Sequence, residues 1–539
     1  MSMHLSRHRV GGGEAAVGDI VDLVMGGMDG ARLRFGLGAP PDPAAELLAR
    51  GSSYFTGAGD GPPLAMLMTN DAGTVETLFG AMAHDVSVVS LPLPPRSPDL
   101  EAYIGGLRTA CSSVGASSIV ASDDVSALLR GCGLETIAHS ELGRTPLPAG
   151  SDHSSGFGIT QFTSGSTNRP KPIRLDGTTL AANVEAILRR TGPRPGDVTV
   201  SWLPLSHDMG LIGMLLTSLA AAGPRWVDGG DIVLIRPEDF LRDPGIWLEA
   251  LSLHRGTFTA APDFGFRMAL RATVAAGVDL SSVRCAITGG EVVRSNTIGD
   301  VVTQLAPIGL AASSMCPAYG MAELGLAATI TTPGEGVTRI ELDVAELADG
   351  VASDVPEGTG VALLASGTPL DGYRVSIDGS GDVGPIRIHG PSIGRNGETG
   401  ESLAGPDGGL VTGDIGFVRD GRLVVCGRSD DYLVVNGRNH YCPEIESHVG
   451  RTVGIREGRV TIAGAPSGDW LVAAEVDRAE LLDGSHRGRL EREVRARVIA
   501  ACGSRPTELR LLGPGSLPMT SSGKLQRHET VGRWIRGDL

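Results

Sequence analysis

The stretch LAMLMTNDAGTVETLFGAMAHDVSVVSLPLPP, Leu64–Pro95, decides the fold class of this chain. A short apolar run opens it, a segment of helix length follows, and a second apolar run closes it. Apolar, β-rich runs that alternate with segments long enough for a helix are typical of βαβ units, in which the strands run parallel. The stretch therefore predicts a strand, a helix and a strand of an α/β domain.

The same alternation recurs further along the chain. It is found in SSIVASDDVSALLRGC (117–132), FTAAPDFGFRMALRATVAAG (258–277) and VRCAITGGEVVRSNTIGDVVTQL (283–305). Repetition of the unit indicates a large N-terminal domain built from α/β subdomains with mostly parallel sheet.

The pattern changes after about residue 360. RVSIDGSGDVGPIRIHGPS (374–392) and GLVTGDIGFVRDGRLVVCGR (409–428) are short strand-like runs separated by Gly and Asp. They predict a small β-barrel-like subdomain, with a hairpin turn around Asp420–Gly421.

A second change comes near residue 428, where two strand-like runs and the helix-like SHRGRLEREVRARVIAACG predict a small α+β domain. We therefore divide the chain into residues 1–427 and residues 428–539.

Composition narrows the possible functions. The chain has 539 residues, 41% hydrophobic and 20% charged, with a net charge of −16. So acidic a chain is a poor candidate for general nucleic-acid binding. No signal peptide and no apolar run of about 18 residues is found, so we expect no membrane span. Seven widely spaced Cys without a C-x-x-C favour free thiols in the cytoplasm.

The segment QFTSGSTNRPKPIRL, Gln161–Leu175, could hold phosphate. Hydroxyls, a flexible glycine and a nearby cation can together bind phosphate oxygens. The residues concerned are Thr163, Ser164, Gly165, Ser166, Thr167 and Lys171. The spacing does not fit a Walker A loop, and taken alone the segment could equally be a solvated turn.

Five further motifs accompany this loop. They are WLPLSHDMGLIGMLL (202–216), AYGMAELGLAAT (318–329), VTGDIGF (411–417), GRSDDYLVVNGRNHYCPEIE (427–446) and LPMTSSGKLQR (517–527). In this order and spacing they resemble the adenylate-forming superfamily of acyl-CoA synthetases, luciferases and peptide-synthetase adenylation domains. Details of the first and fourth motifs, and APDFGF (261–266), resemble the fatty acyl-AMP ligase branch most. The resemblance extends over about residues 64–527.

The resemblance implies an enzyme that joins a lipophilic carboxylic acid to ATP, with Mg²⁺, to give acyl-AMP and pyrophosphate. It implies that the acyl group then passes to a carrier-protein phosphopantetheine or through a downstream acyl-transfer enzyme. It also implies a mobile C-terminal domain that rotates at a hinge near Asp430. Residues 331–367 occupy the place of an insertion that in this branch restrains the small domain and disfavours CoA ligation.

The resemblance also assigns site residues. The Gln161–Leu175 loop would hold the β- and γ-phosphates, Glu323 would bind Mg²⁺, and Lys524 would be the catalytic lysine that bridges carboxylate and α-phosphate. Asp414 would accept from the ribose hydroxyls, and Arg428 would make a second contact to the ribose or a phosphate. His207 is placed with Lys524 and Glu323 among the catalytic residues, and it would line the acyl entrance together with Met209. Adenine and the reacting carboxylate would be contacted by Gly289, Gly290, Glu291, Ala318, Tyr319, Gly320 and Met321.

Two departures from the family pattern concern the loop: Asn168 and Pro172 stand where glycine is common. Asn tolerates a left-handed backbone, and Pro removes one N–H donor. GPSIG (390–394) fits the G-x-S-x-G of serine hydrolases formally, but its context predicts a loop.

Two alternative functions remain open. A CoA ligase would complete thioester formation itself, and a catalytically weak relative would serve as a binding or scaffolding subunit.

Overall fold

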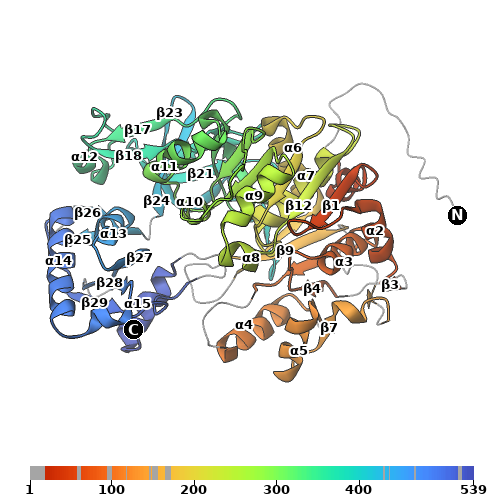
Figure 1. Ribbon diagram of the computed structural model, residues 1–539, viewed down its shortest axis with the longest axis horizontal. Coiled ribbons are helices and arrows are strands. Elements are labelled where there is room, and N and C mark those ends of the chain that lie inside the picture. The colour runs from red at the N-terminus through yellow and green to blue at the C-terminus, as the bar shows by residue number, and fades with distance from the viewer. Residues whose placement is uncertain are drawn as a thin grey trace.

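The computed structural model describes residues 18–56, 62–93, 100–116, 118–144, 147–148, 156–163, 171–428, 431–435, 438–465, 469–519 and 525–539. It confirms the α/β class, with two large mixed sheets and their helices in the N-terminal part (Figure 1). No helix in these ranges has both the length and the apolar character needed to cross a membrane.

The first sheet has nine strands, and its five central pairings are parallel. Its strands, in spatial order, are β19 (Thr368–Pro369), β16 (Ala327–Ile330), β15 (Met315–Gly320), β14 (Cys285–Thr288), β13 (Phe258–Ala261), β11 (Val198–Ser201), β12 (Gly230–Leu234), β1 (Ala31–Phe35) and β2 (Asp42–Pro43). Its associated helices are α7 (Thr217–Ala221), α8 (Pro237–Arg242), α9 (Gly245–Leu253), α10 (Asp263–Leu270) and α11 (Ser295–Leu305).

The second sheet has seven strands and contains the βαβ unit predicted from Leu64–Pro95. Its strands, in order, are β22 (Arg395–Asn396), β10 (Lys171–Asp176), β9 (Gly158–Thr163), β5 (Val88–Ser90), β4 (Leu64–Met66), β6 (Ile119–Ala121) and β7 (Thr136–Ala138). The helices of this region are α1 (Ile20–Met25), α2 (Ala44–Ser52), α3 (Ala72–Ala83), α4 (Leu100–Ser113) and α5 (Asp123–Gly131), and β3 (Phe55–Thr56) pairs with β8 (Leu147–Pro148).

Helix α6 (Gly177–Thr191) lies between the cores of the two sheets. Ala186 and Ile187 pack into the core of the first sheet, whereas Leu180 and Val184 pack into the core of the second. The π-helical segment η2 (Met209–Leu216) is shared in the same way. Apolar side chains of both segments are buried against both sheets, so these two segments join the sheets into one body.

The small antiparallel subdomain is also confirmed. Its sheet consists of β20 (Arg374–Ile377), β21 (Gly384–His389), β23 (Leu410–Arg419) and β24 (Arg422–Arg428). The β23–β24 turn lies at Asp420 and Gly421, as predicted, and both residues have positive φ. Such a turn matches the twist of the strands that it joins.

The candidate insertion, residues 331–367, packs against this subdomain. Its elements are β17 (Arg339–Leu342), α12 (Val344–Ala348) and β18 (Val361–Leu364). Leu342 and Leu363 share a small core with Phe417 and Val424 of β23 and β24. Helix α12 lies close to β26, a strand of the C-terminal part.

The residues after 431 form an α+β unit with its own core (Figure 1). Its elements are β25 (Tyr432–Val435), β26 (Arg438–Tyr441), α13 (Cys442–Gly450), β27 (Ile455–Gly464), β28 (Trp470–Val476), α14 (Gly484–Cys502), β29 (Glu508–Leu512) and α15 (Arg527–Arg536). The division at residue 427 stays a prediction, and the predicted hinge residue Asp430 lies outside the described residues.

The side chain of Asn70 joins the ends of three strands from both sheets. Its amide Nδ2 donates to the carbonyls of Leu203 (3.0 Å) and Ile235 (2.8 Å), and its Oδ1 accepts from the N–H of Leu205 (3.0 Å). Asn70 follows β4, Leu203 and Leu205 follow β11, and Ile235 follows β12. Because Asn70 is 2% exposed, water cannot replace these bonds, and they fix the loop that leads to His207.

We predict that Asn70→Ala lowers the free energy of unfolding of the large domain by about 2 to 4 kcal/mol, because three buried backbone groups lose their partner. Urea denaturation followed by tryptophan fluorescence measures this. Asn296→Ala, at an exposed position in α11, is the control and should cost less than about 1 kcal/mol. Equal effects of the two substitutions would contradict the prediction.

Candidate nucleotide-binding site

Tyr319 and Asp414 meet across two subdomains. The Tyr319 hydroxyl, on β15, donates to Asp414 Oδ2, on β23, over 2.6 Å. Burial raises the pKa of Tyr319 well above its ordinary value, and the negative charge of Asp414 adds to this effect. Tyr319 therefore remains a donor at neutral pH. The bond places two of the predicted site residues, 95 positions apart in the sequence, side by side.

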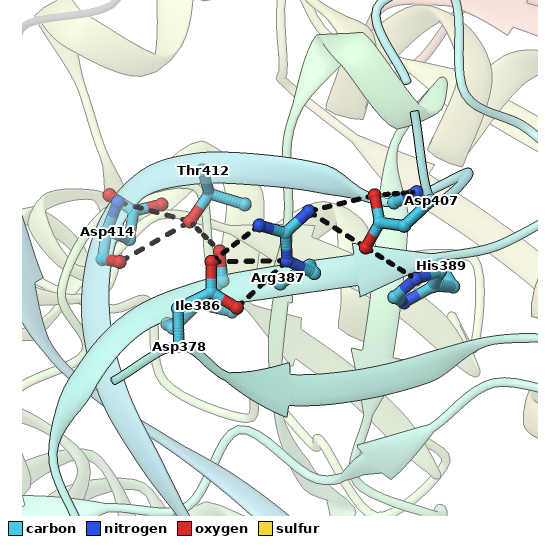
Figure 2. Close-up of polar contacts among 8 residues, drawn as sticks. Asp378, Ile386, Arg387, His389, Asp407, Thr412 and Asp414 are labelled. Carbon is cyan, nitrogen blue, oxygen red and sulfur yellow. Dashed lines mark hydrogen bonds and ion pairs between the residues drawn. The ribbon is translucent and has the colours of Figure 1, made fainter. Parts of the chain in front are cut away.

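The strand that carries Asp414 is fixed by hydrogen bonds and ion pairs (Figure 2). Thr412 Oγ1 donates to the Ile386 carbonyl (3.0 Å) and accepts from the Asp414 N–H (3.1 Å). On the neighbouring strand β21, Arg387 pairs with Asp378 (2.7 Å) and with Asp407 (3.0 Å). These contacts hold β21 in place, and β21 in turn holds the backbone at Asp414.

Arg428, the last residue of β24, lies beside Asp414. Its Nε is 4.0 Å from Asp414 Oδ1, and the two residues are opposite each other in the β23–β24 ladder. A guanidinium and a carboxylate at this separation can both face a polyol or phosphate ligand.

Glu323 lies in the short turn η5 (Ala322–Leu324) between β15 and β16. A buried network of three side chains holds this turn. Ser392 Oγ donates to the Leu324 carbonyl (2.6 Å), and Asn183 Nδ2 donates to the Ala327 carbonyl (2.7 Å) and to the Tyr373 hydroxyl (2.7 Å). Ser392, the serine of GPSIG, is fully buried and has this structural role, as the loop prediction implied.

The carboxyl group of Glu323 lies in an acidic environment. Burial raises its pKa most, the negative charges of Asp208 and Asp414 raise it further, and the positive charge of Arg428 opposes them. In the part of the chain that the structure describes, no three His, Cys, Asp or Glu side chains gather closely enough to hold a metal ion by themselves. One or two carboxylates completed by phosphate oxygens and water are the usual ligands of Mg²⁺, so these residues fit that ion.

Asp208 is a site residue that the sequence reasoning missed. Its Oδ1 accepts from the Met209 N–H (2.7 Å) and lies 2.5 Å from Nδ1 of the half-buried His207. The sequence did hold a signal for it, because Asp208 stands between His207 and Met209, which were both assigned to the acyl entrance. The loop thus brings a carboxylate, rather than the imidazole alone, towards Glu323.

Three predicted site glycines are required by close packing. A Cβ at Gly289 would lie 2.7 Å from the Ala318 carbonyl oxygen, and one at Gly320 would overlap the Leu326 carbonyl. Gly290 has a φ of +74°, and a Cβ there would approach Met209 Sδ to 3.1 Å. The backbones of Gly289 and Ala318 are therefore in close contact, and the Cα of Gly290 lies near the Met209 side chain.

Two other predicted residues have defined positions. Glu291 Oε1 accepts from the Phe264 N–H (2.8 Å) at the start of α10, so its carboxylate also has a helix-capping role. Met321 is half-buried and follows Tyr319 and Gly320 in extended conformation, with φ −160° and ψ 160°.

The two ends of the predicted phosphate loop are described, and its centre is not. Thr163 ends β9 and lies opposite Lys171, which begins β10. Pro172 continues β10 and accepts a hydrogen bond from Gly397 N–H (2.8 Å) through its carbonyl. The other predicted loop residues, Ser164, Gly165, Ser166 and Thr167, lie outside the described residues, as do Asn168 and Lys524.

The raised pKa of Glu323 predicts a pH-dependent effect on stability. A carboxyl group whose folded pKa exceeds its ordinary 4.5 favours the folded state at low pH, and this contribution is lost as pH rises through the folded pKa. Glu323→Gln should therefore raise the thermal midpoint at pH 7.5, with the difference shrinking near pH 4. Differential scanning calorimetry tests this, with exposed Glu101→Gln as control, and a lower midpoint at pH 7.5 would contradict it.

Comparison with known proteins agrees with this geometry. The family model described as "AMP-binding enzyme" matches residues 45–395. The long-chain-fatty-acid–AMP ligase FadD26 of Mycobacterium bovis is 32% identical over 426 residues, covering 72% of this chain and 71% of that protein. The 4-hydroxyphenylalkanoate adenylyltransferase of Mycobacterium tuberculosis is 29% identical over 412 residues, covering 70% of this chain and 65% of that protein.

Solved structures agree as well. A chain from a study of fatty acyl-adenylate ligases from E. coli and L. pneumophila superposes with a TM-score of 0.84 at 25% identity, covering 96% of this chain and 98% of that one. The resemblance to adenylate-forming enzymes, and among them to fatty acyl-AMP ligases, is confirmed. The chain belongs to the AMP-binding enzyme family and is an adenylate-forming ligase.

Proposed function

We propose that this ligase activates a lipophilic carboxylic acid as acyl-AMP and passes the acyl group to a carrier-protein phosphopantetheine, directly or through a partner enzyme. The observation that carries the proposal is the convergence of Tyr319, Glu323, Asp414 and Arg428 from four elements of two subdomains. The similarity to a long-chain-fatty-acid–AMP ligase and to a 4-hydroxyphenylalkanoate adenylyltransferase supports a lipophilic acid.

The nucleoside end of ATP would lie between the two subdomains. Asp414, with Arg428 beside it, would accept hydrogen bonds from the ribose hydroxyls. The ring of Tyr319 would pack on adenine, with Gly289, Gly290 and Glu291 at its other face and Ala318, Gly320 and Met321 alongside. Small residues suit a flat ligand because their backbone can approach it closely.

The phosphates would lie between the 163–171 loop and Glu323. Thr163 and Lys171 pair on adjacent strands at the two ends of this segment. Ser164, Gly165, Ser166 and Thr167 would supply the hydroxyl and N–H donors to the phosphate oxygens. Glu323 would hold Mg²⁺, with Asp208 nearby, and the ion would neutralise phosphate charge. Burial raises the pKa of Glu323 most, and a cation would relieve the smaller contribution that comes from the negative charges of Asp208 and Asp414.

The chemical step needs positive charge at the α-phosphorus. A carboxylate oxygen of the acid attacks this atom, its new bond forms, and the bond to the bridging oxygen breaks as pyrophosphate leaves. Lys524 would neutralise the charge that builds up on the α-phosphate and the carboxylate in the transition state. His207 and Met209 would line the entrance to the acyl site.

The carrier-protein acceptor is favoured by the position of residues 331–367. Helix α12 of this segment lies close to β26 of the C-terminal part, where it would hinder rotation of the small domain. A CoA ligase that forms the thioester itself is the alternative. Incubation with acid, ATP, Mg²⁺ and either CoA or a phosphopantetheinyl carrier separates the two, because rapid acyl-CoA formation by the chain alone would exclude the proposal.

We predict that Lys524→Ala lowers the rate of acid-dependent ATP–pyrophosphate exchange by about 10² to 10³-fold, the size expected when one charge-stabilising group is removed. Its thermal unfolding should match that of the original chain. A variant with near-normal exchange would overturn the assignment.

Lysine labelling offers a test that does not depend on turnover. Lys171 and Lys524 are the two lysines of the chain, and all other basic residues are arginines. We therefore predict that ATP with Mg²⁺ slows modification of both by an amine-reactive reagent, as read by peptide mass spectrometry. The N-terminal amine is the internal control, and unchanged labelling of both lysines would contradict the site.

A further inference from the structure

Arg527 is a half-buried arginine that none of the site assignments uses. It is the first residue of α15 and follows Lys524 by three positions. Its side chain is 17% exposed, and its guanidinium donates to Asp431, Glu446, the Thr461 hydroxyl and the Ile462 carbonyl. These acceptors come from the segment after the predicted hinge, from α13 and from β27.

The Asp431 carboxylate connects Arg527 to the site. Its Oδ1 accepts from Arg527 Nε (3.1 Å) and Nη2 (2.9 Å), whereas its Oδ2 accepts from the backbone N–H of Arg428 (3.2 Å). One carboxylate therefore joins the last residue of β24, which lies beside Asp414, to the residue that begins α15. The predicted hinge lies between Arg428 and Asp431.

Glu446 anchors the other side of the guanidinium. Its Oε1 accepts from Ile462 N–H (2.7 Å) and from Arg527 Nη1, and its side chain is 11% exposed. The planar fork of arginine reaches Asp431 and Glu446 at once, which a lysine ammonium cannot do with the same fixed geometry. The start of α15 is thereby held against both the post-hinge segment and the domain core.

We propose that Arg527 is a positioning residue for adenylation, which fixes the start of α15, and hence Lys524, to the post-hinge segment through Asp431. The inference rests on the proposed role of Lys524. Rotation at the hinge then carries the lysine with it, because Asp431 moves together with Arg527.

The test compares Arg527→Lys and Arg527→Gln with the original chain in acid-dependent ATP–pyrophosphate exchange. We expect kcat to fall about 10- to 100-fold, since a displacement of about 1 Å can cost on the order of 100-fold in rate. The KM values for ATP and for the acid should change less than about 3-fold, because Arg527 touches neither. Arg533→Gln, which removes the half-buried Arg533–Glu529 pair (3.0 Å) of the same helix, is the matched control and should leave kcat unchanged.

A second variant separates positioning from simple stabilisation. Asp431→Asn keeps the shape of the side chain and should reproduce the loss of kcat, and the double variant with Arg527→Gln should lose little more. If Arg527→Gln does not fold, the single variant Asp431→Asn still tests the proposal. A fall in kcat that disappears on cooling to well below each variant's thermal midpoint would show a stabilising role only and overturn the inference.

The outcomes for the two proposals are distinguishable. Normal kcat in folded Arg527→Gln and Asp431→Asn, with Lys524→Ala inactive, overturns the positioning role and leaves the proposed function standing. An active Lys524→Ala overturns both.

Discussion

Three hydrogen bonds from one buried amide, that of Asn70, determine where the site can form. They join the end of β4 in one sheet to the ends of β11 and β12 in the other. The loop after β11 continues directly into His207, Asp208 and η2, so its path is set before any site residue is reached. Helix α6 and η2 fill the space between the sheets and prevent either from shifting alone.

The candidate site is assembled where this rigid body meets the small antiparallel sheet. Glu323 and Tyr319 come from the first sheet, and Asp414 and Arg428 from the small one. Neither pair of residues forms the candidate site alone. Buried hydrogen bonds of Asn183, Tyr373 and Ser392 hold the turn that carries Glu323, and Thr412 holds the backbone at Asp414. The C-terminal part is a separate unit with its own hydrophobic core.

The fold class and the order of the elements could be predicted because they depend on local patterns. Alternation between strand and helix runs placed β4, α3 and β5, and the Asp420–Gly421 turn was marked by its residue types. The partners of Asn70, Asn183 and Arg527 could not be predicted in this way. Asn183 bonds to Tyr373, 190 positions away, and no periodicity in the sequence encodes such a pairing. Asp208 was missed for another reason, since its importance lies in its charge near Glu323 rather than in a motif position.

The Tyr319–Asp414 hydrogen bond has a consequence for ligand binding. The hydrogen bond from Tyr319 means that a sugar hydroxyl reaching Asp414 would meet a carboxylate that already has one donor, instead of rescuing an unpaired charge. A carboxylate can accept from several donors at once, so such a ligand would not require Tyr319 to release Asp414. The phenol hydroxyl would then hold the carboxylate in one orientation both before and after the ligand binds.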